Sequence, residues 1–351
     1  MKGRAASYNP PNRFLREEQA QEILWAIDEF ELPEKINTKI IEVFPKTIIN
    51  KLQIPDQSFL YSLNPYQGCE HGCAYCYARP SHEYWGYGAG LDFESIILVK
   101  KTAPDLLEKE LRNPHRLVSP IIIAGNTDCY QPIEKKLQLT RRILQVLKEY
   151  RHPFSIITKN ALVLRDLDIL IEMATQNLVS VTLSITSTDE TLRALLEPRT
   201  STYANRFKAL KTLAQYNIPC GVMVAPIIPG LNDKDVPNVL KTAAESGAKW
   251  AGFTIVRLND TVEPVFIQWL EKYFPDRKEK VLSLIKQCHN GSLSDRRMGK
   301  RFKGDGTVAE SIHQLFSIFR KKYFPENYTF THNCKAFTGN KVGELIQGSL
   351  F

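Results

Sequence analysis

The chain has 351 residues, of which 43% are hydrophobic, and a formal net charge of +8 at pH 7. This composition is typical of a soluble globular protein with a large core. No apolar run approaches the length of a membrane span, and the polar, proline-containing start does not resemble a signal peptide. We therefore expect a cytoplasmic protein in a reducing environment. The positive excess is compatible with nucleic-acid contact, and equally with a protein that binds no polyanion.

The first part of the chain, residues 1–57, is predicted to be an N-terminal extension. Its prolines at 10 and 11 favour extended chain over residues 9–14, because proline blocks a helix. Apolar residues at near-helical spacing predict a short helix over 17–30, and an alternating run predicts a strand over 40–45.

From about residue 62 the sequence alternates between strand and helix patterns. Short β-branched runs predict strands at 119–124, 154–158, 178–185, 220–225 and 250–256, with another before Cys69. Amphipathic patterns predict helices at 134–150, 165–176, 203–216 and 233–246. Six such repeats imply a parallel sheet in an α/β fold, and they suit a partial (β/α)6 barrel of the TIM type. The functional site of such a barrel lies at the C-terminal ends of its strands.

We place the core at residues 58–290 and a C-terminal extension at 291–351. Helices are predicted at 277–287 and 308–323, with a basic, glycine-bearing segment at 296–304 between them.

Three cysteines, Cys69, Cys73 and Cys76, fall in the spacing C-x3-C-x2-C within one loop. Gly68 and Gly72 precede the first two, and glycine tolerates the backbone angles that fold thiolates toward one point. Three convergent thiolates favour a soft metal. A [4Fe–4S] cluster usually takes four cysteines, so three would leave one iron open to a substrate or cofactor.

A zinc site and a disulfide framework are the two alternative uses of these cysteines. A structural zinc site could combine them with His71 or His82. However, zinc sites usually contain paired C-x2-C units, and no second unit occurs in the sequence. A disulfide framework is disfavoured because the chain is long and its seven cysteines are an odd number.

The cysteine loop resembles the cluster-binding signature of the radical S-adenosylmethionine (SAM) superfamily, including the aromatic Tyr75 before the third cysteine. The resemblance implies a [4Fe–4S] cluster whose open iron chelates SAM and reduces it to methionine and a 5′-deoxyadenosyl radical. It also implies a partial barrel and an electron donor such as flavodoxin or ferredoxin. The stretches 125–134, 158–160, 196–199 and 225–233 are similar to the branch of this family related to spore photolyase.

The resemblance also assigns roles to residues at the predicted strand ends. Asn126, Thr127 and Asp128 stand where the family holds the SAM amino group, although its usual Gly-Gly-Glu motif is replaced. Lys159 is expected to pair with the SAM carboxylate, and Ser184 to hydrogen-bond its ribose. The alternatives are a surface lysine and a hydroxyl that caps nearby backbone.

Arg199 is expected to pair with a carboxylate, either that of SAM or that of Glu197, and a purely structural ion pair is the alternative. Cys129 lies in the loop from which spore photolyase supplies a hydrogen-atom donor, so it is a candidate catalytic residue. The alternative is an inert buried thiol.

These observations lead to a radical SAM enzyme as the main hypothesis. Likeness to spore photolyase suggests DNA or RNA as the substrate, with the basic segment following the phosphates. Modification of a protein or small molecule is an alternative, because fold likeness does not settle function. A metal- or cluster-bearing nucleic-acid-binding module without catalysis is the non-enzyme alternative.

Overall fold

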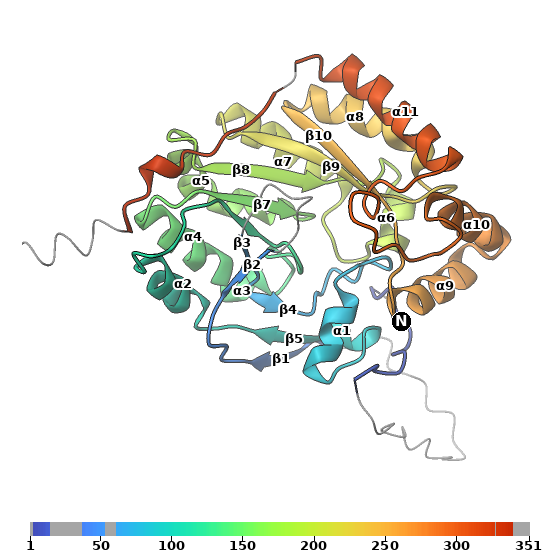
Figure 1. Cartoon of the computed structure of the whole chain (residues 1–351), viewed down its shortest axis with the longest axis horizontal. Coiled ribbons are helices and arrows are strands. Elements are labelled where there is room, and N and C mark those ends of the chain that lie inside the picture. The colour runs from blue at the N-terminus through green and yellow to red at the C-terminus, as the bar shows by residue number, and fades with distance from the viewer. Residues whose placement is uncertain (1–2, 15–36, 53–60, 327, 340–351) are drawn as a thin grey trace, which may run out of the picture.

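The computed structural model of the chain describes residues 3–14, 37–52, 61–326 and 328–339. Its main sheet has the strand order β10-β9-β8-β7-β6-β3-β2. The parallel strands of this sheet are β3 (Tyr61–Leu63), β6 (Ile121–Ile123), β7 (Phe154–Thr158), β8 (Val179–Ser184), β9 (Cys220–Ile227) and β10 (Trp250–Ile255). The sheet is open between β10 and β2, which confirms the α/β class and the partial barrel (Figure 1).

The strands form where the sequence is apolar and β-branched, and their alternate residues are buried on one face of the sheet. In β6, Ile121 and Ile123 are fully buried, and β8 buries Val179, Val181 and Leu183. Helices α4, α5, α7 and α8 cover the outer face of the sheet (Figure 1). Their bounds are Leu139–Glu149, Leu167–Ala174, Tyr203–Gln215 and Val236–Glu245.

The single helix predicted over 134–150 is wrong. The chain forms α3 (Glu134–Leu137) and then α4, because Gln138 between them adopts a left-handed conformation with φ +50°. Sequence patterns also missed four α-helices, α1 (Leu91–Ser95), α2 (Ala103–Leu111), α6 (Glu190–Leu196) and α9 (Val262–Tyr273).

A second, smaller sheet lies beside the first, in the order β1-β5-β4. Its strands are β1 (Lys39–Glu42), β5 (Ile96–Val99) and β4 (Tyr66–Gln67), with the short helix α1 (Leu91–Ser95) before β5. The predicted strand over 40–45 is thus found as β1, while the helix predicted over 17–30 falls outside the described residues. From the predicted extension, β1 pairs with β5 and β2 (Ile49–Lys51) pairs with β3.

The last part of the chain lies against the open edge of the barrel. The Ile255 amide at the end of β10 donates a hydrogen bond to the Phe302 carbonyl at 2.8 Å. Helix α10 (Lys278–Cys288) precedes this segment and α11 (Thr307–Tyr323) follows it, packing along α8 (Figure 1). In the described parts of the chain, none of the helices has the length and apolar character needed to span a membrane.

Candidate active site

The three cysteines of the motif lie on the loop between β4 and the short 3-10 helix η1 (Arg79–Trp85). Cys69 and Cys73 are buried, and Cys76 is half-buried. The loop is tightly turned, since the Gly72 amide donates to the Cys69 carbonyl at 3.3 Å and the Cys76 amide to the Cys73 carbonyl at 3.3 Å.

Glycine is required at one point of this loop for two reasons. Gly68 has φ +80°, which side chains rarely tolerate, and a Cβ there would lie 2.5 Å from the Ile96 carbonyl oxygen. The close approach joins the loop to β5, because the Cys69 amide donates to the Phe93 carbonyl at 2.8 Å just before that strand.

A buried arginine holds the loop from within. Arg79 is fully buried, and its Nε and Nη2 donate to the Cys73 carbonyl at 3.1 and 2.8 Å. Its Nη1 donates to the carbonyls of Ala89 and Gly90 at 3.1 and 2.9 Å. Nη2 also pairs with the buried Glu94 Oε1 at 2.5 Å. Because a guanidinium offers five donors in a fixed plane, one side chain can fix several backbone points at once.

The start of the chain contributes to the same arrangement. The Ala5 and Ala6 amides donate to the two carboxylate oxygens of Glu94 at 3.2 and 2.9 Å. Ala5 also packs in one apolar cluster with Cys73, Ala74 and other residues. The N-terminal residues therefore form part of the wall behind the cysteine loop.

Burial disfavours a negative charge on each of the three thiols. Burial raises the pKa of Cys69, Cys73 and Cys76, and neighbouring thiols of the group raise those of Cys69 and Cys73 further. Buried thiolates are therefore costly unless a metal compensates their charge.

A single metal ion and a cluster place different demands on these cysteines. Among the described residues, no three His, Cys, Asp or Glu side chains are grouped so that one metal ion could be held. Cysteines of a [4Fe–4S] cluster bind different irons and need not meet at one centre, as zinc ligands must. Of the two histidines of the zinc alternative, His71 lies with Nδ1 3.4 Å from Asp128 Oδ2 and Nε2 3.3 Å from Asn160 Nδ2. His82 is fully buried, with its ring against Tyr87 and Phe93.

The loop after β6 carries three of the predicted SAM-binding residues and lies against the cysteine loop. The Asn126 amide donates to Asn64 Oδ1 at 2.8 Å, and its Nδ2 donates to Ser81 Oγ at 3.2 Å. The Thr127 hydroxyl donates to the Tyr66 carbonyl at 2.6 Å. Both side chains thus fasten this loop to the β4–η1 region.

Asp128 links the cysteine loop to the end of β7. Its carboxylate accepts hydrogen bonds from the Thr158 hydroxyl and the Lys159 amide, both at 2.7 Å. Burial by itself raises the pKa of Asp128, but His71, the Lys159 amide and the Thr158 hydroxyl outweigh it and lower the pKa to about 2. The carboxylate is therefore ionised at neutral pH.

Lys159 lies between the cysteine loop and the barrel. Its Nζ is 5.8 Å from the centroid of the Tyr75 ring. Lys159 directly follows β7, and its neighbour Tyr75 lies between Cys73 and Cys76 in the chain, which places the ammonium group beside the cysteine loop. No ion pair of Lys159 is found within the described ranges, which leaves its charge available to an anion.

Behind Lys159 lies a buried ion pair that the sequence did not reveal. Glu197 is fully buried, accepts from the Tyr75 hydroxyl, and pairs with Arg206 Nη2 at 2.6 Å. Arg206 Nη1 also donates to the carbonyl of Ser184, at the end of β8, at 2.8 Å. This contact fixes the backbone of Ser184 at the barrel rim, where its side chain is predicted to hydrogen-bond the ribose of SAM.

The carboxylate that Arg199 contacts is Glu70, not the Glu197 considered from the sequence. Arg199 Nη2 lies 3.1 Å from Glu70 Oε1, which also accepts from the Thr38 hydroxyl at 2.7 Å. Arg199 is 30% exposed, whereas Glu197 is enclosed and already paired with Arg206. Whether Arg199 also meets SAM stays a prediction.

Cys129 is fully buried and belongs to the main hydrophobic core. Its carbonyl accepts from the Thr140 hydroxyl at 2.6 Å, and burial raises the pKa of its thiol. This environment favours an inert core thiol. A role of Cys129 as a hydrogen-atom donor stays a prediction.

A family model described as the radical SAM superfamily matches residues 63–243, just over half of the chain. The chain belongs to the radical SAM superfamily. The predicted enzyme class is therefore confirmed, and the reaction on the substrate is open.

Several known proteins are similar to this radical SAM chain. An uncharacterised protein of Mycobacterium tuberculosis is 33% identical over 251 residues, covering 70% of this chain and 73% of that protein. An uncharacterised protein of Methanocaldococcus jannaschii is 36% identical over 195 residues, which covers 56% of this chain and 70% of that protein. A solved structure of spore photoproduct lyase complexed with dinucleoside spore photoproduct has a TM-score of 0.59 at 17% identity. That similarity covers 82% of this chain and 80% of the other.

Within this radical SAM site, the structure brings most of the predicted residues together around the cysteine loop. The residues that sequence reasoning missed are the buried charges Arg79, Glu94 and Arg206. A signal was present for Arg206, because it lies on the helical face of α7 that also buries Tyr203 and Leu210. A charge on an apolar face indicates a buried partner.

Proposed function

We propose that Cys69, Cys73 and Cys76 hold a [4Fe–4S] cluster and that the protein cleaves SAM reductively. The observation that carries this proposal is one tightly turned loop that bears all three thiols and meets the C-terminal ends of β6 and β7 through the contact of His71 with Asp128. When bound, the cluster supplies the electron that breaks the bond between sulfur and C5′ of SAM, giving methionine and a 5′-deoxyadenosyl radical.

The chain's own residues position SAM and keep water out. Lys159, which forms no ion pair within the described residues, lies beside Tyr75 of the cysteine loop, and we assign it to the SAM carboxylate. Asn126 is assigned to the amino end, and Ser184, fixed by Arg206, to the ribose. Thr127 and Asp128 act by holding the loop in place, since their polar groups already have protein partners.

The test is formation of 5′-deoxyadenosine. The full chain is purified and reconstituted without oxygen, reduced with dithionite and given SAM, and the products are separated by chromatography. We expect 5′-deoxyadenosine and methionine in equal amounts, and neither without dithionite. A full, reducible cluster that releases no 5′-deoxyadenosine, or a protein that takes up only zinc, would contradict the proposal.

Replacing Lys159 by methionine is expected to weaken SAM binding by roughly 10- to 100-fold, the loss expected for one charge-assisted hydrogen bond. The methionine keeps the volume against Tyr75, so iron content should not change. The measurement is the Kd of SAM by equilibrium dialysis with the oxidised, reconstituted protein. The matched control is Lys208→Met on α7, where the lysine is exposed to solvent. Equal affinity of the two variants would remove Lys159 from the SAM site.

The electron would come from a small protein such as flavodoxin or ferredoxin, which fits the cytoplasmic location we propose. Neither is needed for the dithionite assay, so the proposed chemistry can be tested without them.

We propose nucleic acid as the substrate class, with modification of a protein or small molecule as the alternative. The support is the fold shared with a lyase solved with a dinucleoside lesion and the net charge of +8. The basic segment at 296–304 carries less unpaired positive charge than its sequence suggests, because Arg296 pairs with Asp260 and Arg297 with Asp295. Affinity for a single-stranded oligonucleotide should fall steeply with salt, and an affinity that does not change with salt would exclude phosphate contacts.

A further inference from the structure

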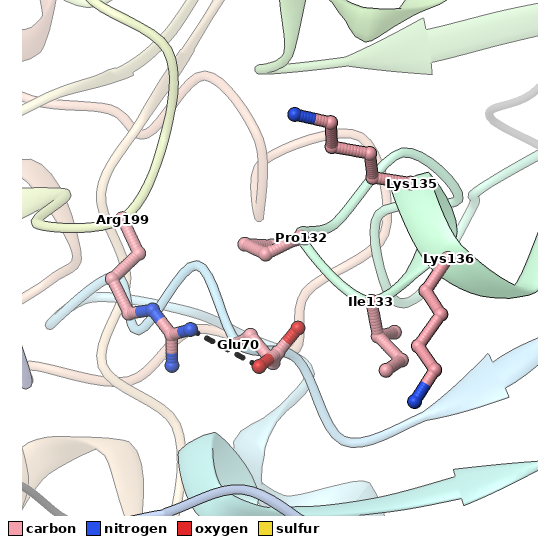
Figure 2. Close-up of a pocket in the computed structure, with 6 residues that line it drawn as sticks. All are labelled: Glu70, Pro132, Ile133, Lys135, Lys136 and Arg199. Carbon is pink, nitrogen blue, oxygen red and sulfur yellow. Dashed lines mark hydrogen bonds and ion pairs between the residues drawn. The ribbon is translucent and has the colours of Figure 1, made fainter.

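A basic pocket opens beside the cysteine loop. It has a volume of about 340 Å³, and its lining consists of Glu70, Pro132, Ile133, Lys135, Lys136 and Arg199. Figure 2 shows Glu70 at its centre, joined to Arg199 on one side, with the two lysines of α3 on the other side pointing in different directions. Arg199, whose contact with SAM stays a prediction, lines this pocket, whereas Lys159, Asn126 and Ser184 do not.

The charge of the pocket is positive at its rim. Lys135 and Lys136 are exposed, and no carboxylate pairs with either within the described parts of the chain. The one acidic residue in the lining, Glu70, is buried and shares Oε1 with Arg199 and Thr38. The rim therefore attracts an acidic surface, since complementary charge steers and orients association.

The floor of the pocket is next to the proposed cluster. Glu70 follows Cys69 directly in the chain, and consecutive Cα atoms are about 3.8 Å apart. The Glu70 amide is fixed by Gln131 Oε1 at 2.8 Å, and Gln131 Nε2 donates back to the Gly68 carbonyl at 3.2 Å. A partner seated over Glu70 is thus within a short distance of a cysteine that binds iron.

The pocket and the residues proposed to bind SAM lie beside different parts of the cysteine loop. Lys159 lies near Tyr75, between Cys73 and Cys76 in the chain, with Nζ 5.8 Å from the ring centroid, while the pocket is formed around Glu70 next to Cys69. A protein bound at the pocket would leave Lys159 and Ser184 free for SAM.

We propose that this pocket is the docking surface for an acidic one-electron carrier, a flavin or iron–sulfur protein of low potential. This inference rests on the proposed function, because the electron is needed only if SAM is cleaved reductively. The carrier loses one electron and the cluster gains it, with no bond made or broken. Glu70 Oε2, which is buried and has no hydrogen-bond partner among the described residues, would accept a donor from an inserted loop of the carrier.

The experiment compares two double charge reversals in the reconstituted full chain. Lys135→Glu with Lys136→Glu alters the pocket, and Lys208→Glu with Lys211→Glu makes the same change of net charge on exposed lysines of α7. Two readouts are used, the affinity of oxidised flavodoxin by titration calorimetry and the rate of cluster bleaching by reduced flavodoxin in stopped flow. At low salt we expect the pocket variant to lose about 10-fold or more in both, and the α7 variant to resemble the wild type.

Dithionite separates this inference from the proposed function. Both variants should form 5′-deoxyadenosine with dithionite at the wild-type rate, because a small reductant needs no docking surface. If dithionite supports the reaction but flavodoxin binds and reduces the pocket variant as well as the wild type, the docking surface is elsewhere. If the pocket variant instead loses affinity for a single-stranded oligonucleotide with unchanged reduction by flavodoxin, the pocket binds nucleic acid and the inference is overturned. Absence of 5′-deoxyadenosine from the wild type with dithionite would reject the proposed function itself.

Discussion

Replacing Cys73 by alanine is expected to abolish 5′-deoxyadenosine formation, with a loss greater than about 100-fold. A residue that merely supports a metal ligand typically accounts for 10- to 100-fold, so a larger loss is the mark of a ligand. The backbone at this position should be preserved, because Arg79 holds the Cys73 carbonyl through two hydrogen bonds that do not involve the thiol. The measurement is product formation together with iron content and the visible absorption of the reconstituted protein.

The matched control is Cys334→Ala, which likewise removes one thiol. Cys334 is half-buried and lies in the short 3-10 helix η5 (Cys334–Ala336). It should retain iron and activity. Thermal unfolding of the apoproteins checks that the Cys73→Ala chain still folds. A Cys73→Ala protein that keeps its iron and still releases 5′-deoxyadenosine would remove this cysteine from the ligand set.

The sequence predicted the elements whose signals are local. Strand β7 was placed to the residue over 154–158, because an apolar β-branched run there ends at the polar Lys159-Asn160 pair. Helix α7 was placed within one residue, and Thr202 caps its start by accepting from the Asn205 amide. The long helix over 134–150 failed because a left-handed residue, Gln138, carries no glycine or asparagine signal.

The site was predictable where one loop carries the chemistry, and not where distant residues meet. The three cysteines lie within eight residues, so their grouping was visible in the sequence. Arg199 was considered as a partner of Glu197 because the two are neighbours in the chain. In the fold, Glu197 contacts Tyr75, which is 122 positions away, and Arg199 contacts Glu70, which is 129 positions away. Such pairs follow from how the strand ends converge, which no local pattern encodes.

Replacing Arg79 by methionine is expected to destabilise the apoprotein by about 3–5 kcal/mol, the cost typical of removing one partner from a buried ion pair. Methionine fills much of the space but leaves the Glu94 carboxylate charged and buried. The Cys73, Ala89 and Gly90 carbonyls also lose their donor. Urea unfolding followed by circular dichroism measures the change, and iron uptake should fall with it because the cysteine loop loses its internal support.

The control is Arg112→Met, which breaks an ion pair whose side chains are 60% and 34% exposed. Exposed pairs contribute about 0–1 kcal/mol, so this variant should unfold nearly as the wild type does. Adding Glu94→Leu to Arg79→Met removes the unpaired charge and should restore part of the stability. The recovery should be incomplete, because the Ala5 and Ala6 amides then lose their acceptor. If Arg79→Met costs no more than Arg112→Met, the buried pair does not hold the cysteine loop, and its rigidity must come from Gly68 and the backbone contact to β5.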